Sequence, residues 1–490
     1  MKTITMEFKD LEPRSLWGNF AGLNEVPRAS KNEAKVIQFM IDYGRSLGLE
    51  TLTDAIGNVI IKKPATQGME DRKTVILQSH LDMVHQKNGD SSFNFDTQGI
   101  DMYVDGDWVK ARGTTLGADN GIGVAAIMSV LSADDIVHPA IEALFTIDEE
   151  TGMTGAKQLD PGNLSGTILL NLDTEEDDEL TIGCAGGIDT NTIYSYKQVP
   201  VAANGIAYQV SITGLLGGHS GMDIHKGRAN ANKLMNRFLF NGLKAFDLNL
   251  SSVDGGSLRN AIPRESTSIV VIPSDQEQDF KRFIADFTDL IKKEFQAVEQ
   301  SLSINAVTVA CPAHVVAHDD AAKIVQAIYA LPNGVFRMSP DIDDLVEASS
   351  NLARVIVKGG DFITQSLQRS SVESTKLDVA YAVAAPFELM GCNVSRSGDY
   401  PGWKPNADSD ILRLMTNLYQ EIFREAPKVN ACHAGLECGI LGAHLPGMDM
   451  ISFGPTIHGA HSPDEKVKVP SVQKFWGYLV KVLAAIPVNK

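Results

Sequence analysis

The segment Lys73–Val84 constrains the fold most, because an apolar run in it leads directly into two polar residues. Val75–Leu77 have the continuous apolar character of a strand that is buried on both faces, which is typical of a parallel sheet. The run ends in His80-Leu-Asp82. In open α/β proteins, ligands bind at the carboxyl ends of such strands. The segment therefore predicts an α/β fold with His80 at a functional edge of its sheet.

Two further apolar runs end in acidic side chains. Residues 140–147 lead into Asp148-Glu149-Glu150, and residues 166–172 lead into Asp173. Three consecutive carboxylates repel one another unless a cation compensates their charge, although a solvated turn would also carry them. Both runs predict strands whose acidic ends lie at the same edge as His80.

Asp119 and His461 add two candidate ligands. Asp119 stands just before the buried helix predicted after Gly121, where a helix N-cap is the simpler interpretation. His461 follows a strand predicted at residues 450–453. Imidazole and carboxylate groups gathered at strand ends are what a two-metal hydrolytic site needs. Together these residues predict such a site, although no single one does.

Composition excludes several classes of protein. At 490 residues the chain is expected to form more than one domain. A net charge of −18 disfavours nucleic acid and membranes as partners, because both need a basic face. Residues 1–10 have no apolar targeting segment, and no run approaches a membrane span, so we expect a cytoplasmic protein.

The polar motifs, taken in order, resemble those of the di-zinc exopeptidase family, which includes aminoacylase, glutamate carboxypeptidase and carnosine-type dipeptidases. The matching segments are His80-Leu-Asp82, Gly117-Ala-Asp119-Asn-Gly, Asp148-Glu149-Glu150-Thr-Gly, Asn171-Leu-Asp173 and Ala460-His461-Ser-Pro-Asp-Glu. Two more, Gly218-His219-Ser-Gly-Met-Asp and Cys432-His-Ala-Gly-Leu-Glu-Cys-Gly, resemble the bacterial aminoacyl-histidine dipeptidase branch. The resemblance extends over essentially the whole chain.

The resemblance implies two zinc ions per chain, for which manganese or cobalt can substitute. Five residues would bind them: His80, Asp119, Glu150, Asp173 and His461. His80 and Asp173 would belong to one ion, Glu150 and His461 to the other, and Asp119 would bridge the pair. The resemblance also implies a cis peptide bond between Asp119 and Asn120.

Two further carboxylates would support the chemistry. Asp82 would orient His80, as carboxylates commonly do for metal-bound imidazoles, and Glu149 would be the general base. His458 lies outside the family motif and is interpreted as a pocket or packing histidine and not as a ligand. The acidic residues 175–179 are interpreted as a solvated loop, and Ser30-Lys-Asn-Glu33 as a capping box before a helix.

The strand-end residues stop near residue 187 and resume after residue 399. Residues 187–399 are therefore predicted to form an α+β lid domain, inserted into a catalytic domain made of residues 1–186 and 400–490. The catalytic domain is expected to be α/β, with a mixed, mainly parallel sheet. Within the lid, strands are predicted at 209–212, 268–272 and 377–383, and an amphipathic helix at 278–295.

A weak internal repeat suggests that the lid is duplicated. Ser257-Leu-Arg-Asn260, followed by Glu265-Ser-Thr, resembles Ser366-Leu-Gln-Arg369, followed by Glu373-Ser-Thr, which aligns Asn260 with Arg369. In family terms, His219 and Asn260 would reach the reacting carbonyl, Arg369 would hold the substrate's C-terminal carboxylate, and Gly435 would contact the same end. Taken alone, Arg369 fits a surface cation and Asn260 a turn residue.

The resemblance implies a zinc-dependent dipeptidase that hydrolyses Xaa-His dipeptides, including β-alanyl-histidine. A small dipeptide would be its partner, and a homodimer is left open. An N-acyl-amino-acid deacylase of the same fold is the alternative, and a non-catalytic metal- or peptide-binding protein is an alternative of another class. Glu149 argues against the last, because a binding protein has no need of a spare carboxylate beside Glu150.

Overall fold

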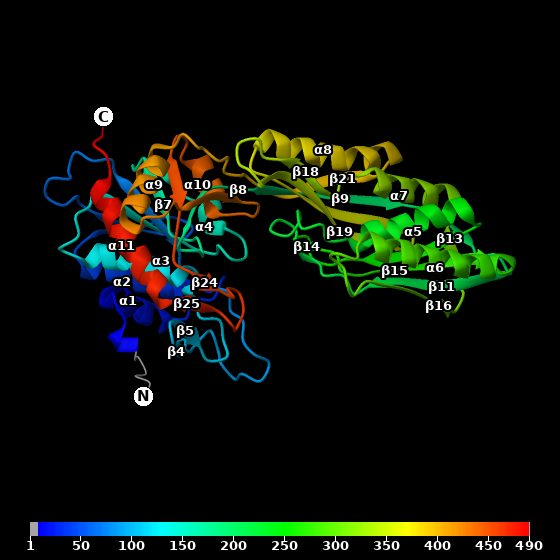
Figure 1. Cartoon of the computed structure of the whole chain (residues 1–490), viewed down its shortest axis with the longest axis horizontal. Coiled ribbons are helices and arrows are strands. Elements are labelled where there is room, and N and C mark those ends of the chain that lie inside the picture. The colour runs from blue at the N-terminus through cyan, green and yellow to red at the C-terminus, as the bar shows by residue number, and fades with distance from the viewer. Residues whose placement is uncertain (1–7, 490) are drawn as a thin grey trace. The chain divides into compact units, whose positions relative to one another are not determined.

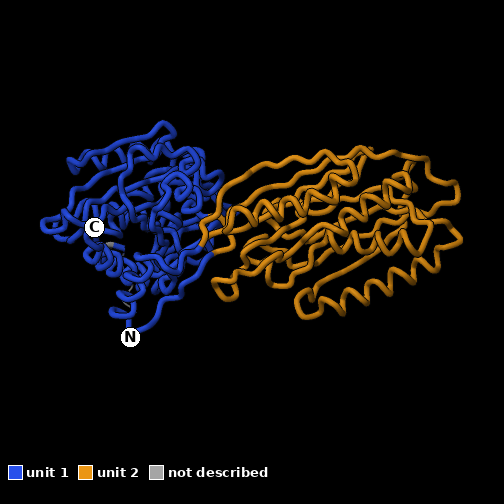
Figure 2. Tube along the Cα trace, turned by 90° about the horizontal axis from the view of Figure 1, so that it is seen from above, with its two compact units in different colours: residues 1–183, 405–431, 436–490 blue, residues 184–404, 432–435 orange. Residues whose placement is uncertain are grey.

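The computed structural model describes residues 8–489 and divides the chain into two compact units (Figures 1 and 2). Unit 1 comprises residues 1–183, 405–431 and 436–490, and unit 2 comprises residues 184–404 and 432–435. The segment expected to form the lid lies within unit 2, which also takes in the short piece 432–435. Residues 1–7, which belong to the segment from which localisation was predicted, lie outside the described residues.

The main sheet of unit 1 has the strand order β1-β2-β6-β3-β7-β23-β8-β22. Its four central strands are parallel: β6 (Ile141–Thr146), β3 (Val75–His80), β7 (Ile168–Asn171) and β23 (Asp449–Ser452). On one side, β2 (Val59–Lys63) pairs antiparallel with β6 and with β1 (Glu50–Thr53). On the other side, β8 (Glu179–Cys184) pairs antiparallel with β23, and β22 (Lys428–Cys432) follows in the strand order. Every residue of β3, β6 and β7 is buried, as expected of parallel strands covered on both faces. The predicted mixed, mainly parallel sheet is confirmed.

Helices pack against this sheet (Figure 1). Helix α3 (Ala118–Ser132) is buried almost throughout and contacts both β3 and α1 (Arg14–Asn24). The other longer helices of unit 1 are α2 (Ala34–Ser46), α9 (Asp410–Phe423), α10 (Glu437–His444) and α11 (Val469–Ala485). A hairpin near residue 105 consists of β4 (Met102–Asp105) and β5 (Trp108–Ala111), which join β25 (Lys466–Lys468) and β24 (Ile457–His458) in a small sheet. Among the described residues, no helix is long and apolar enough to cross a membrane.

Apart from short extra strands, unit 2 contains the order β-α-β-β-α-β twice. The first copy consists of β11 (Gly205–Thr213), α5 (Ala231–Ala245), β13 (Asn249–Gly255), β15 (Ser266–Pro273), α6 (Glu277–Glu294) and β16 (Ser303–Val309). The second consists of β9 (Gly186–Ser195), α7 (His318–Ala330), β19 (Val346–Lys358), β20 (Asp361–Ser370), α8 (Glu373–Met390) and β21 (Asn393–Tyr400). In the sheet order β16-β11-β15-β13-β19-β20-β9-β21, the two copies meet at the β13–β19 pair. Counted outward from this pair, β15, β11 and β16 of the first copy correspond to β20, β9 and β21 of the second. This arrangement confirms the predicted duplication.

The predicted equivalence of Asn260 and Arg369 is wrong. Because β20 occupies the place that β15 has in the first copy, Arg369 near the end of β20 corresponds to the end of β15. Asn260 lies in the connection between β13 and β15, which corresponds to the turn at Gly359 and Gly360. The short sequence match is therefore out of register with the structural repeat.

Two local predictions are also wrong. Residues 377–383 form part of helix α8 and not a strand, because Val379, Ala380 and Val383 are buried at helical spacing. The capping box does not form: Glu33 occupies the N-cap position of α2 without a side-chain cap, and Ser30 Oγ donates to Asp82 Oδ2 at 2.8 Å. A tertiary hydrogen bond thus replaces the local one. The amphipathic helix predicted at 278–295 is confirmed as α6.

Candidate metal centre

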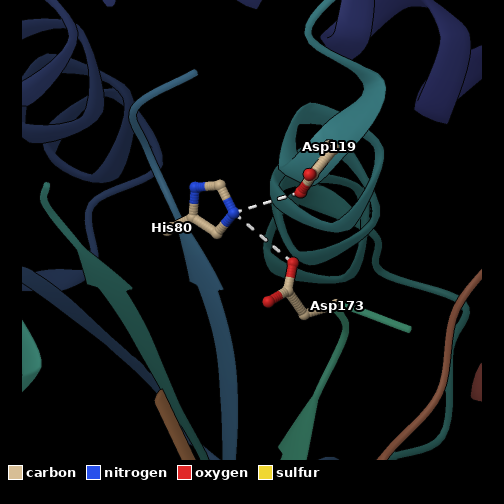
Figure 3. A group of neighbouring side chains, drawn as sticks. All are labelled: His80, Asp119 and Asp173. Carbon is tan, nitrogen blue, oxygen red and sulfur yellow. Dashed lines mark hydrogen bonds and ion pairs between the residues drawn. The ribbon is translucent and has the colours of Figure 1, made fainter. Parts of the chain in front are cut away.

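The end of β3 brings three of the predicted ligands together (Figure 3). His80 Nε2 lies 3.2 Å from Asp119 Oδ1 and 3.4 Å from Asp173 Oδ1. Asp173 follows β7, the parallel neighbour of β3, and Asp119 lies in the first turn of α3, which packs on β3. These three residues form one group whose ligand atoms are close enough to bind a single cation.

A second group shares Asp119 with the first. His461 Nε2 lies 3.2 Å from Asp119 Oδ2 and 3.0 Å from Glu150 Oε2. Each carboxylate oxygen of Asp119 therefore faces a different histidine, which is the geometry of a ligand shared by two neighbouring cation positions. Glu149 lies beside them, in a third group with His80 and Glu150. Unit 1 thus gathers all five predicted ligands and the predicted base.

Asp119 is not the helix cap that its position in the sequence also allowed. Gly117 occupies the N-cap position of α3 with a φ of +70°, and the backbone of Asp119 is not helical. The Asp119–Asn120 peptide bond is cis, as the family resemblance implied.

Asp82 contacts more than His80. Its Oδ1 lies 3.5 Å from His80 Nδ1 and accepts a hydrogen bond from Glu149 N at 3.0 Å, while Oδ2 accepts from Ser30 Oγ and, at 3.3 Å, from Glu150 N. Burial alone would raise the pKa of Asp82, but His80 and the Glu149 N–H group hold this pKa below its usual range. The structure therefore connects Asp82 to the loop that carries Glu149 and Glu150.

Negative charge is concentrated in this centre. Burial raises the pKa of Asp173 to about 6, with Asp119 and Glu150 adding to the effect against the influence of His80. Burial also raises the pKa of Glu149 well above its usual range. Hydrogen bonds with Asp119 and Glu150 raise the pKa of His461 to about 11. Carboxylates this close repel one another, and a cation between them relieves the repulsion.

The donor set fits divalent cations. Glu150 Oε1 is a buried oxygen without a hydrogen-bond partner, a state that is costly unless another group satisfies it. Two imidazoles combined with carboxylates are ligands that zinc, manganese and cobalt accept. His458 belongs to neither group: its ring lies 5.1 Å from that of Trp108, and Nε2 lies 3.4 Å from Glu176 Oε1.

Two charged residues near the centre have no counterpart in the sequence predictions, and a third lies in the predicted acidic loop. Glu175 is exposed, in agreement with that loop, and desolvation together with the charges of Asp119 and Asp173 raises its pKa to about 8. Glu465 and Arg28 are both buried. Glu465 ends the Ala460–Glu465 motif, which could have drawn attention to it, whereas no sequence pattern marks Arg28.

Unit 2 brings together the predicted substrate residues that it carries on β12 (Gly218–His219) and β20. Arg369 is 4% exposed, donates from Nη1 to Tyr400 Oη at 2.9 Å, and its Nη2 lies 3.4 Å from His219 Nε2. Arg369 Nε donates to Ser220 Oγ at 3.3 Å, and Asn260 O accepts from Ser220 N at 2.8 Å. Arg369 is therefore not a surface cation, and Asn260 joins the group through its backbone.

Gly435 lies in the piece 432–435, two residues after His433. His433 is 6% exposed, and its Nε2 lies 2.7 Å from Ser349 Oγ. Burial and then the positive charge of Arg369 lower the pKa of His219 to about 4 and that of His433 to about 3. Both imidazoles are therefore neutral at pH 7. Among the described residues, no carboxylate lies within 4 Å of the Arg369 guanidinium, whose hydrogen bonds go to Ser220, Tyr400 and His219.

Comparison with known proteins identifies the class. A family model described as peptidase family M20/M25/M40 matches residues 76–485. The chain is 40% identical over 483 residues to the cytosol non-specific dipeptidase of Escherichia coli (strain K12), with 99% of this chain and 100% of the relative covered. The crystal structure of aminoacylhistidine dipeptidase from Vibrio alginolyticus matches with a TM-score of 0.93, 43% identity and full coverage of both chains. Aminopeptidase PepT from Bacillus cereus matches with a TM-score of 0.56 at 15% identity, covers 97% of this chain and 99% of its own, and shows the fold alone.

Fold and site together define a hydrolase whose α/β unit carries a centre rich in carboxylates and histidines. The chain belongs to peptidase family M20/M25/M40. The resemblance drawn from the motifs is confirmed over the whole chain.

Proposed function

We propose that the chain is a dipeptidase that hydrolyses Xaa-His dipeptides, including β-alanyl-histidine, with two zinc ions or, in their place, manganese or cobalt. The observation that carries this proposal is the position of Asp119, whose two carboxylate oxygens each face a different histidine. The names of two relatives support the substrate class: one is a non-specific dipeptidase, and the other acts on aminoacyl-histidine.

Each of the predicted site residues in unit 1 has a role in this proposal. His80 and Asp173 hold one cation, Glu150 and His461 hold the other, and Asp119 contacts both. Two such ions would supply Lewis acidity, which polarises the scissile carbonyl and makes the attacking water more acidic. Glu149 then accepts the proton of the attacking water and passes it to the leaving amine. Asp82 fixes the orientation of His80 and, through two backbone hydrogen bonds, the loop of Glu149.

The predicted site residues of unit 2 are proposed to recognise the C-terminal end and the scissile carbonyl of the substrate. Arg369 is proposed to bind the C-terminal carboxylate, because a planar guanidinium binds a carboxylate through two parallel hydrogen bonds. His219 and Asn260 are proposed to stabilise the negative charge that develops on the carbonyl oxygen, and Gly435 to contact the C-terminal end of the dipeptide. A buried guanidinium with no carboxylate within 4 Å among the described residues supports this assignment.

We also propose that small dipeptides are the main partners, that nucleic acids and membranes are not partners, and that the protein acts in the cytoplasm. The net charge of −18 supports the exclusion of nucleic acids and of anionic membranes. The name of the E. coli relative, a cytosol dipeptidase, supports the proposed location. A homodimer is compatible with this proposal but not required by it.

A substrate panel tests the proposal. The metal-free chain would be loaded with zinc, manganese or cobalt and assayed on Xaa-His dipeptides, other dipeptides and N-acetyl amino acids. We expect hydrolysis of dipeptides that contain histidine at the second position. Faster turnover of N-acetyl amino acids would identify a deacylase instead, and metal binding without any hydrolysis would identify a binding protein.

A further inference from the structure

Glu465 attaches the loop of His461 to the turn that carries Asp119. Glu465 and His461 lie in the same short loop, in which Glu465 N donates to Ser462 O at 3.0 Å. The carboxylate of Glu465 is buried and accepts four backbone hydrogen bonds, from Leu116 N at 2.7 Å, Gly117 N at 3.0 Å, Ala118 N at 2.7 Å and Asp119 N at 3.2 Å. These donors lie 346 to 349 positions earlier in the chain, at the start of α3, where a helix leaves its N–H groups without partners.

Arg28 holds the same turn through its carbonyl groups. Arg28 Nη2 donates to Gly117 O at 2.5 Å, and Nη1 donates to Leu81 O at 3.2 Å and Asp82 O at 3.3 Å. Arg28 is buried, and a Cβ atom at Gly117 or at Gly121 would collide with its Nη2 atom, so the two glycines make room for the guanidinium. Arg28 therefore joins the end of β3, from which His80 extends, to the start of α3.

We propose that Glu465 is a positioning residue for the cation position formed by Asp119, Glu150 and His461, an inference that rests on the two-cation function proposed above. One carboxylate holds both the turn of Asp119 and the loop of His461, whose side chains meet at 3.2 Å. The loop of His461 is otherwise held at its two ends, where β24 pairs with β25 and β25 pairs with β5, and these pairs do not contain Asp119. The position formed by His80, Asp119 and Asp173 keeps its attachment through Arg28 and the paired strands β3 and β7. Loss of Glu465 therefore weakens one cation position selectively.

Glu465→Gln is the discriminating substitution because glutamine has nearly the same shape but only one acceptor oxygen. Its NH₂ group would face two of the four N–H groups that the carboxylate now satisfies. Glu465→Asp is the second variant, since it keeps the charge but shortens the reach of the carboxylate. Glu142→Gln is the matched control: Glu142 is also buried in unit 1 and accepts from Ser165 N and Gly166 N, but it belongs to none of the cation groups.

The experiment measures binding of the metal alone. Metal-free wild type and variants are titrated with Zn²⁺ by calorimetry and with Co²⁺ by visible absorption, and their melting temperatures are recorded in parallel. We expect wild type to bind two ions per chain. Glu465→Gln should bind one ion as wild type does and the other about 10- to 100-fold more weakly, the usual cost of losing a residue that orients a ligand. Glu142→Gln should bind both ions normally even where its melting temperature falls as far.

Three results would overturn the assignment. If Glu465→Gln does not fold, Glu465→Asp takes its place and the same criteria apply. Two ions bound with wild-type affinity would show that Glu465 has no positioning role, and an equal weakening of both ions, or the same weakening in Glu142→Gln, would show a general loss of stability. Fewer than two ions in wild type would refute the two-cation function itself, which distinguishes that failure from failure of the role of Glu465.

Discussion

Asp82 Oδ1 accepts a hydrogen bond from Glu149 N at 3.0 Å. The same oxygen lies 3.5 Å from His80 Nδ1, so one buried carboxylate contacts both a proposed ligand and the loop of the proposed base. These two residues belong to loops that follow the neighbouring parallel strands β3 and β6. Their relationship explains why a ligand and a base from distant parts of the sequence keep a constant separation, and it yields a prediction for each residue.

Replacing Glu149 tests the base. Glu149→Gln should keep both cations, because Glu149 is proposed as a proton carrier and not as a ligand, and should lose about 10²- to 10⁴-fold in turnover. Metal analysis combined with steady-state kinetics on one Xaa-His substrate measures both quantities. A nearly normal rate at full metal content would contradict the role of Glu149.

Replacing Asp82 should have a broader effect. Asp82→Ala removes the carboxylate that lies 3.5 Å from His80 Nδ1, whereas the backbone carbonyl of residue 82, at 3.1 Å from the same nitrogen, remains. It also leaves the N–H groups of Glu149 and Glu150 without their acceptor. We expect about 10- to 100-fold weaker metal binding, together with lower turnover when the metal is saturating. Turnover that recovers fully at saturating metal would show that Asp82 acts on His80 alone and does not position Glu149.

The duplicated architecture of unit 2 leads to a prediction about the assembly. A second copy of the β-α-β-β-α-β order within the chain can provide contacts that a single copy would have to obtain from another subunit. Activity per chain should therefore stay constant on dilution, even through the concentration at which any dimer dissociates. Parallel measurements of rate and sedimentation decide this point, and a rate that falls in step with the dimer would refute it.

His433 predicts an acid-sensitive contribution to stability. Its pKa is lowered to about 3 in the folded chain, first by burial and then by Arg369, so between about pH 3 and 6.5 the unfolded chain binds the additional proton. The free energy of unfolding therefore falls as the pH falls through this window, by roughly 1–2 kcal/mol between pH 6.5 and pH 5 from this group. His433→Gln should show a shallower dependence than wild type in denaturant unfolding between pH 5 and 7. An unchanged slope would contradict the lowered pKa.

The sequence identified the metal centre better than the unit 2 site, for a physical reason. Each proposed ligand follows an apolar run or precedes a buried helix, and parallel strands bring such ends to one edge, so His80 and Asp173 could be placed together in advance. Arg28 could not be found, because its partners are backbone carbonyls that carry no sequence signal. The alternation of apolar and polar residues at 377–383 predicts a strand, yet over so short a segment it also fits the buried side of a helix, which is what forms. The sequence match that aligns Asn260 with Arg369 is too short to set the register of the repeat, and the strand order gives another register.

Arg369 gives the sharpest test of the proposed specificity. A dipeptidase has to reject longer chains, and a fixed guanidinium does so by requiring a free carboxylate one residue beyond the scissile bond. Arg369→Ala should lose activity on Xaa-His while its metal content stays unchanged, because Arg369 lies in unit 2 and none of the proposed ligands does.

The same residue should decide between an acid and its amide. Wild type should discriminate strongly against the C-terminal amide of Xaa-His, because an amide leaves the buried guanidinium without a counter-charge. Arg369→Ala should discriminate far less, since the guanidinium that binds the carboxylate is absent. Values of kcat/KM for acid and amide in both proteins measure this, with Arg354→Ala as the control, because Arg354 pairs with Asp254 in the same unit. A preference for the acid that is undiminished in Arg369→Ala would mean that another residue binds the carboxylate.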